Sequence, residues 1–145
     1  MTEVAFHFNV PDKLAYSCRL LRKAVAKGAR VAVLAETRDV QRFDRDLWEF
    51  APAEFLPHCI AGGATSAVQA ASPIVLCDSV AAVVHDQVLL NLGQDVPAGF
   101  ERFERLIELV ACDAADRERS RLRWRHYTAR GYSITRHDVA RQVPR

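Results

Sequence analysis

The first 49 residues alternate twice between the periodicity of a β-strand and that of an α-helix, and this order limits the folds open to the chain. Residues 4–10 place apolar side chains at every second position, which predicts a strand. A helix over residues 12–27 follows, and residues 30–35 form an apolar run typical of a strand buried on both faces. A second helix is expected over residues 38–49. The order predicts an α/β fold with three layers, in which helices flank a Rossmann-like, largely parallel sheet.

The limits of the two helices are marked by residues that commonly begin or end helices. Pro11 and Asp12 precede the first helix, and Gly28 provides a stop after it. Thr37 is suited to cap the second helix, because its hydroxyl can accept a hydrogen bond from a free backbone N–H. A strand, a helix and a second strand in this order imply a parallel pair of strands joined by a right-handed crossover.

The remainder of the chain gives shorter signals. Residues 73–77 and 87–92 are expected to be strands. An apolar stripe at helical spacing predicts another helix, and its residues are Phe100, Phe103, Ile107 and Val110. An arginine-rich helix is expected over residues 117–130, either continuous with the preceding one or restarting near Asp113. A last short strand is expected near Tyr132.

No segment is long enough or polar enough to serve as a linker between domains. We therefore expect a single domain over residues 1–136. Residues 51–58 contain two prolines and predict an ordered loop. Residues 137–145 predict a flexible C-terminal tail.

Positive charge is concentrated at the C-terminal end of the chain. The net charge of the whole sequence is +2. Residues 117–145 contain nine arginines against Glu118 and Asp138, a net charge of +7. Residues 1–116 carry 11 basic and 16 acidic side chains, a net charge of −5. This asymmetry indicates an acidic partner for the C-terminal region.

The cysteines and the N-terminus bear on the compartment of the protein. The four cysteines are far apart in apolar surroundings, which favours buried free thiols over a disulfide or zinc framework. They are Cys18, Cys59, Cys77 and Cys112. No apolar run reaches the length of a membrane span, and the N-terminus lacks the features of a signal peptide. We therefore expect a cytoplasmic protein that has no membrane partner.

No pattern of catalytic residues stands out. The turn after the first strand, residues 9–12, has no glycine, whereas a dinucleotide site needs glycines there to bring backbone N–H groups to the phosphates. His58 beside Cys59 could be part of a metal site, but no second pair of ligands stands at a suitable spacing. We expect no catalytic residues, no cofactor and no metal ion, and an enzyme on a Rossmann-like scaffold is kept only as a less favoured alternative.

Two segments carry a more specific resemblance. In the first, a helix ends in Leu47-Trp48 and is followed by a Pro-x-x-Phe-x-Pro-His loop over residues 52–58. In the second, an arginine-rich helix is closed by Gly131-Tyr132. The order and spacing of these pieces resemble the chi subunit family of bacterial DNA polymerase III, over nearly the whole chain.

The resemblance implies an adaptor in DNA replication rather than an enzyme. Members of this family belong to the clamp-loader assembly of the polymerase, whose catalytic activity resides in other subunits. They hold the acidic C-terminal tail of single-stranded DNA-binding protein, which ends in an aromatic residue with a free carboxylate. A second surface binds the psi subunit of the clamp loader, so that contact with DNA is indirect.

The resemblance also assigns residues to these two surfaces. The tail-binding positions correspond to Val110, Arg117, Arg121 and Trp124, and one member of the family has tyrosine in place of Trp124. The helical spacing places the last three on one face. Trp48 and Phe55 are candidates for the surface that binds psi or an equivalent partner. Direct binding of single-stranded nucleic acid by the arginine-rich helix is the main alternative, because arginines and aromatic rings suit that ligand as well.

Overall fold

The computed structural model of the chain describes residues 1–50 and 56–141. The strands run in the order β1 (Glu3–Val10), β2 (Val31–Leu34), β3 (His58–Ile60), β4 (Ile74–Cys77), β5 (Val88–Asn91), β6 (Arg105–Ala111) and β7 (Ile134–Asp138). The α-helices are α1 (Lys13–Ala26), α2 (Thr37–Phe50), α3 (Ser66–Ala71) and α4 (Ala114–Ala129). Short 3-10 turns are η1 (Ala61–Gly63), η2 (Val80–Ala82), η3 (Phe100–Arg102) and η4 (Val139–Arg141).

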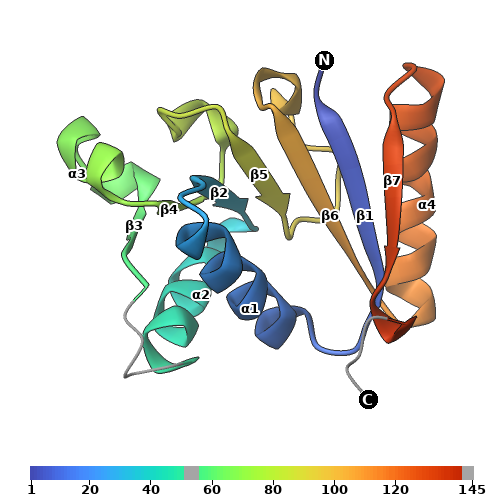
Figure 1. Cartoon of the computed structure of the whole chain (residues 1–145), viewed down its shortest axis with the longest axis horizontal. Helices are drawn as coiled ribbons and strands as arrows, with labels where there is room; N and C mark the ends of the chain where they lie inside the picture. The colour runs from blue at the N-terminus through green and yellow to red at the C-terminus, as the bar shows by residue number, and fades with distance from the viewer. Residues whose placement is uncertain (51–55, 142–145) are drawn as a thin grey trace.

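Within the described residues, the strands form one sheet of seven in the order β3-β4-β2-β5-β6-β1-β7, and all neighbours are parallel (Figure 1). The predicted α/β class with a parallel sheet is therefore confirmed. The strands β1 and β2 run parallel as expected but are not neighbours, since β5 and β6 lie between them. A strand–helix–strand pattern fixes the direction of the second strand, but not how many strands from later in the chain are inserted between the two.

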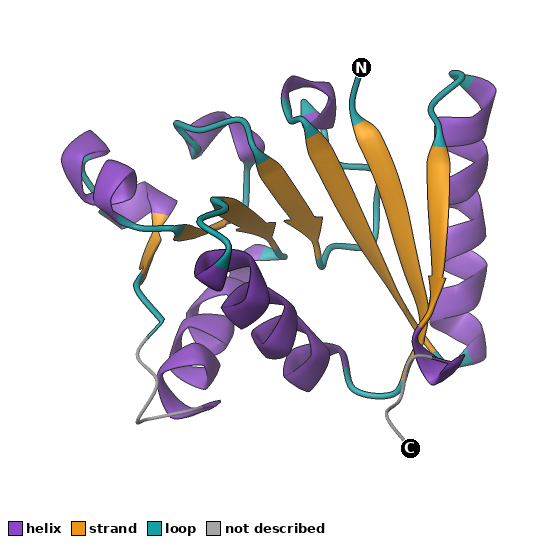
Figure 2. Ribbon diagram, in the orientation of Figure 1, coloured by secondary structure: helices purple, strands orange, loops and turns teal. Residues whose placement is uncertain are grey.

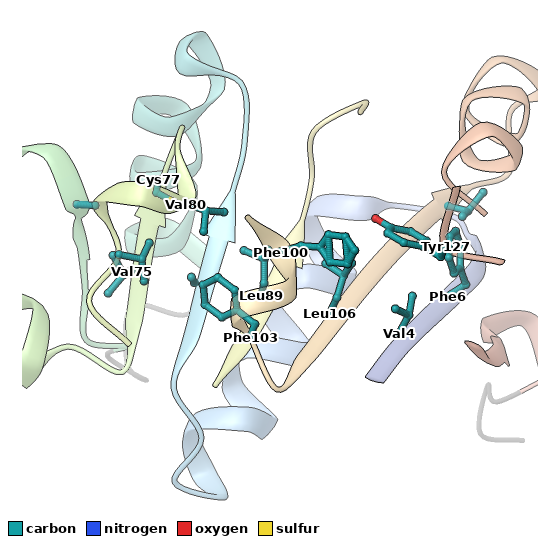
Figure 3. Close-up of a cluster of buried hydrophobic side chains, with 14 residues drawn as sticks. Val4, Phe6, Val75, Cys77, Val80, Leu89, Phe100, Phe103, Leu106 and Tyr127 are labelled. Atoms are coloured by element: carbon teal, nitrogen blue, oxygen red, sulfur yellow. The ribbon is translucent and has the colours of Figure 1, made fainter. Parts of the chain in front are cut away.

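Helices cover the two faces of the sheet, which gives the expected three layers (Figure 2). Cys18 and Leu21 of α1 pack with residues of α2 and with one side of β2, β4, β5 and β6. On the other side, Tyr127 of α4 packs with Phe100, Phe103 and residues that include Val4 and Leu106 (Figure 3). The helix α1 begins after Pro11 and Asp12 as expected, and the Asp12 side chain caps it by accepting a hydrogen bond from the Ala15 N–H.

The predicted helix that was to contain Ile107 and Val110 is wrong. Only residues 100–102 turn, and residues 105–111 form β6, a central strand between β5 and β1. A short apolar run fits both the helical and the strand period, and here both faces of the strand are buried. Leu106 and Val110 pack on the α4 side, whereas Ile107 and Leu109 pack on the α1 side.

Smaller differences from the sequence-based expectations occur elsewhere. The strand β3 and the helix α3 were not predicted, because both are too short to show a period. The expected tail begins with ordered structure: β7 continues to Asp138 and Val139 is buried, while residues 142–145 lie outside the described residues.

Not all four thiols are buried, since Cys112 is exposed and Cys59 is partly exposed. Among the described residues, no helix combines the length and apolar character that crossing a membrane requires.

We expect acid to destabilise the fold in part through His85. This side chain is only 8% exposed, and its Nδ1 accepts a hydrogen bond from the Gln87 N–H at 3.2 Å. Burial, and after it the charges of Arg30 and Arg102, lower the pKa of His85 from 6.5 to about 4, against a weaker opposite effect of Asp86. The unfolded chain therefore takes up this proton at a higher pH than the folded chain. The free energy of unfolding should fall as the pH drops from about 6.5 to about 4.

Urea unfolding at several pH values between about 7.5 and 4.5 measures this dependence. The variant His85→Gln should lose stability less steeply over that interval than the wild type. Some decline will remain, because burial and His137 also lower the pKa of His7 to about 4. An identical pH dependence in the two proteins would contradict a role for His85.

Candidate functional site

The arginine-rich helix α4 begins at Ala114, three residues before the predicted start, and its ends are fixed by local hydrogen bonds. The Asp113 side chain caps the helix by accepting from the Asp116 N–H at 3.0 Å. Of the two alternatives, continuation of a preceding helix is wrong, since a strand precedes α4, and the helix begins beside Asp113. At the other end Gly131 adopts a φ of 80°, and its N–H and that of Tyr132 bond back to the last turn. This is the glycine stop that the sequence indicates.

Asp116 ties the first turn of α4 to the rest of the protein. Its carboxylate accepts hydrogen bonds from the Ala111 N–H at 2.7 Å and from the Lys13 ammonium at 2.9 Å. Burial opposes ionisation of Asp116, but these two bonds outweigh it and lower the pKa of the carboxyl. The N-terminus of α4 is thereby held against the end of β6 and the start of α1.

A buried polar cluster holds the middle of α4 to the sheet. Glu108 of β6 is fully buried and accepts from the Tyr127 hydroxyl at 2.6 Å and from Arg123 Nε at 3.1 Å. Asn91 of β5 donates to both carboxylate oxygens at 3.1 Å, and Arg123 Nη1 donates to the Gln94 carbonyl. Burial raises the pKa of Glu108, and Arg123, Tyr127 and Asn91 counter this rise by stabilising the carboxylate. The cluster fixes the rotation of α4 on the sheet.

A groove of about 650 Å³ opens between α4 and the adjoining strands, and we call it the α4 groove. All four predicted tail-binding positions line it, although Val110 comes from a strand and not from a helix. Five lining residues were not predicted as site residues. The full set is Phe6, Phe8, Asn9, Val110, Arg117, Ser120, Arg121, Trp124 and Arg136.

The floor of the α4 groove is apolar. Phe6 and Val110 are buried, and the Trp124 ring meets the Phe6 ring edge to face with 5.1 Å between the centroids. The Arg136 guanidinium lies over the rings of both Trp124 and Phe8, 5.7 Å and 5.6 Å from their centroids. The floor therefore offers aromatic surface beneath a positive charge.

Two arginines lie on the polar rim of the groove. Arg117 has a neutral hydrogen-bond partner, and Arg121 has a charged partner that is exposed to solvent. Arg117 Nη2 donates to Asn9 Oδ1 at 3.0 Å, and Arg121 Nη1 lies 2.7 Å from Glu118 Oε2 in an exposed ion pair. Asn9 has a φ of 60°, a left-handed conformation that is uncommon for a residue with a side chain, and it also donates to Asp138 at 3.0 Å. Both guanidinium groups remain exposed to an incoming ligand.

Three of the residues that the prediction missed have a partial signal in the sequence. Phe6 and Phe8 are two apart on a strand, so their rings share a face, and that face is the one beneath α4. Asn9 follows them directly. Arg136 has no such signal, because its position over Trp124 depends on β7 pairing with β1.

Guanidinium groups, an amide, a hydroxyl and apolar side chains line the α4 groove. Its lining contains no cysteine, histidine or carboxylate that could act as nucleophile, acid or base. In the part of the chain that the structure describes, no three metal-ligating side chains gather at one point. Two exposed guanidinium groups beside an apolar floor are suited to a ligand that combines a carboxylate with an apolar side chain.

Trp48, one of the two residues expected at the second surface, lies on α2, which packs on the opposite face of the sheet from α4. Trp48 is 48% exposed, and its ring centroid lies 4.6 Å from that of His58. His58 Nε2 is in turn 3.0 Å from Asp44 Oδ1. Phe55 lies outside the described residues.

Comparison with known proteins identifies the family. The model of a family described as "DNA polymerase III chi subunit, HolC" matches residues 1–135. The chain is 30% identical to the DNA polymerase III subunit chi of Pseudomonas aeruginosa, over 97% of this chain and 99% of the relative. It is 26% identical to the subunit of the same name from Haemophilus influenzae, over 85% of each chain. The resemblance seen in the sequence motifs is therefore confirmed, and the matched range includes every lining residue of the α4 groove except Arg136.

Proposed function

The chain belongs to the DNA polymerase III chi subunit family and is a replication accessory subunit, and from this premise we propose that it is a non-catalytic adaptor. In this proposal the α4 groove binds the acidic C-terminal tail of single-stranded DNA-binding protein. A second surface connects the subunit to the clamp loader, and the polymerase activity resides in other subunits.

One observation carries the proposal: Val110, Arg117, Arg121 and Trp124 come from two elements and line a single groove. The terminal aromatic side chain of the tail would pack against Val110 and Trp124. Its free α-carboxylate would accept hydrogen bonds from the guanidinium groups of Arg117 and Arg121, which can bind a carboxylate through two parallel N–H donors.

Two further features support an acidic ligand of this kind. The net charge of +7 over residues 117–145 attracts an acidic segment from a distance. Tryptophan at position 124 retains the aromatic surface but has no hydroxyl, so no phenolic hydrogen bond to the tail is available there. Arg136, which lies over the Trp124 ring, supplies an additional charge at the same point.

The second part of the proposal concerns Trp48. A tryptophan that is 48% exposed on a helix presents a large apolar surface, and such residues often anchor protein–protein interfaces. Since α2 and α4 pack on opposite faces of the sheet, a partner at Trp48 would leave the α4 groove accessible. This partner is the psi subunit or its equivalent in the clamp loader.

A calorimetric titration tests the tail-binding proposal. The ligand is a short acidic peptide that ends in phenylalanine with a free carboxylate, and the control is the same peptide with a C-terminal amide. We expect binding of the free acid, much weaker binding of the amide, and a loss of affinity as salt rises, because exposed charges are screened. If the wild-type protein shows no affinity for the free-acid peptide, the proposal is wrong.

A further inference from the structure

A second groove lies on the α1 side of the sheet, away from the α4 groove. Here β1 and β7 present His7 beside His137, and Ala5 beside Thr135. The helix α1 packs over β6, and among the described residues no α-helix covers β1 and β7 on this side in Figure 2, where the 3-10 turn η4 lies at the ends of these strands. Between α1 and these strands is a groove of about 490 Å³, which we call the α1 groove.

The helical wall of the α1 groove is basic. Lys23 of α1 and Lys27, which caps the C-terminus of this helix, line it, and neither forms an ion pair within the described residues. Arg105 of β6 lines it as well and lies 3.6 Å from Glu3, but both side chains are exposed and such pairs contribute little. Residues 13–30 contain six basic side chains and no acidic one, although residues 1–116 as a whole are acidic. The charge on this helix is therefore local.

Two aromatic rings, those of His7 and His137, line the floor of the α1 groove, and Tyr16 of α1 holds the first of them from outside the lining. The His7 and His137 ring centroids are 4.6 Å apart, and the Tyr16 ring centroid is 5.7 Å from that of His7. A hydrogen bond of 2.5 Å between His7 Nδ1 and the Tyr16 hydroxyl fixes the first ring. All three rings are partly exposed. The His7 and His137 rings offer aromatic surface on this face of the sheet, beside Lys23 and Lys27.

We propose that the α1 groove binds single-stranded nucleic acid. Rings on an open sheet are surfaces on which bases stack, and lysines along the edge are suited to contact the phosphates of the same strand. An acidic protein segment could form ion pairs with the lysines, but its carboxylates would not stack on the flat rings of His7 and His137. Duplex DNA is too wide and too stiff to lay its bases on this floor. The inference goes beyond the peptide-binding proposal, because it concerns a different face and a different ligand.

Fluorescence anisotropy with a labelled oligothymidylate, at low salt and without any other protein, tests the inference. We expect the wild type to bind and to lose affinity steeply as salt rises. The double variant Lys23→Glu, Lys27→Glu should bind at least about tenfold more weakly and with a smaller salt dependence, since each phosphate contact contributes about 0.7 to the slope for single strands. The variant His137→Ala should lose about fivefold or more in affinity while keeping the wild-type salt slope, because it removes stacking and not charge.

The variant Arg121→Ala is the matched control, since it removes a positive charge from the α4 groove and leaves the α1 groove intact. It should bind the oligonucleotide like the wild type, and circular dichroism melting should show that all variants are folded. Absence of binding by the wild type at low salt would overturn the inference. The inference would also be overturned if Arg121→Ala lost binding while the double lysine variant retained it, because the nucleic acid would then bind at α4. If the wild type bound an acidic peptide through Lys23 and Lys27 but bound no oligonucleotide, the groove would be assigned to a protein partner instead.

Discussion

Replacing Arg123 by alanine should lower the free energy of unfolding by about 3–5 kcal/mol, the usual cost of removing one partner from a buried ion pair. Arg123 is 2% exposed and Glu108 is fully buried. Without the guanidinium, the Glu108 carboxylate loses its only opposite charge within the cluster and keeps the hydrogen bonds of Tyr127 and Asn91. Its desolvation is then no longer compensated. The Gln94 carbonyl also loses its donor.

Urea unfolding at neutral pH measures this effect, with Arg125→Ala as the matched control. Arg125 is an exposed arginine on the same helix, and its removal should change the free energy of unfolding by less than about 0.5 kcal/mol. Pairing Arg123→Met with Glu108→Gln should recover much of the loss, because the uncompensated charge disappears together with its partner. Equal stabilities of Arg123→Ala and Arg125→Ala would show that the cluster does not hold α4 to the sheet.

The first four elements could be predicted because local signals are sufficient for them. The alternation in β1 and the cap at Asp12 depend on neighbouring residues alone. The register of the sheet, in contrast, does not depend on neighbouring residues alone. The apolar pattern of β6 fits a helix as well as a strand, and only its place between β5 and β1 in the sheet distinguishes the two. For this reason Val110 was assigned to a helix, although it lies on a strand.

The arginine-rich helix shows what a charge pattern can and cannot reveal. Arg121 and Arg123 look alike in the sequence, yet the first lines the α4 groove and the second is buried against Glu108. The helical period separates them, since residues two apart point to different faces. A buried partner for Arg123 could not be predicted, because Glu108 was placed in a helix. Counting every arginine as solvent-exposed overstates the charge that α4 offers to nucleic acid.

The α4 groove itself was predicted only through the family resemblance. Phe8, Asn9 and Arg136 are brought to Trp124 by the pairing of β1 with β7, segments that are more than a hundred residues apart in the chain. No local pattern contains that pairing. The left-handed backbone of Asn9 and its hydrogen bond to Arg117 are likewise products of the folded sheet edge.

Arg121→Ala should weaken binding of the acidic, aromatic-ended peptide by about 1.5–3 kcal/mol, or about 10- to 150-fold, the typical worth of a hydrogen bond to a charged group. In the free protein Arg121 pairs with Glu118, but the two side chains are 63% and 73% exposed. Such a pair contributes little, so Arg121 can exchange Glu118 for the peptide carboxylate at small cost. Isothermal titration of each variant with the same peptide measures the change.

Two variants on the same helix show whether the loss is specific to the groove. Arg125→Ala removes the same charge, but Arg125 does not line the α4 groove, so its effect should be limited to weaker long-range attraction. Glu118→Gln removes the competing carboxylate and should tighten binding by about two- to fivefold. If Arg125→Ala weakened binding as much as Arg121→Ala, the peptide would be held by the general charge of α4 and not by a defined groove. If Glu118→Gln left the affinity unchanged while Arg121→Ala reduced it, Glu118 would not compete with the peptide, and Arg121 would be fully available to its carboxylate.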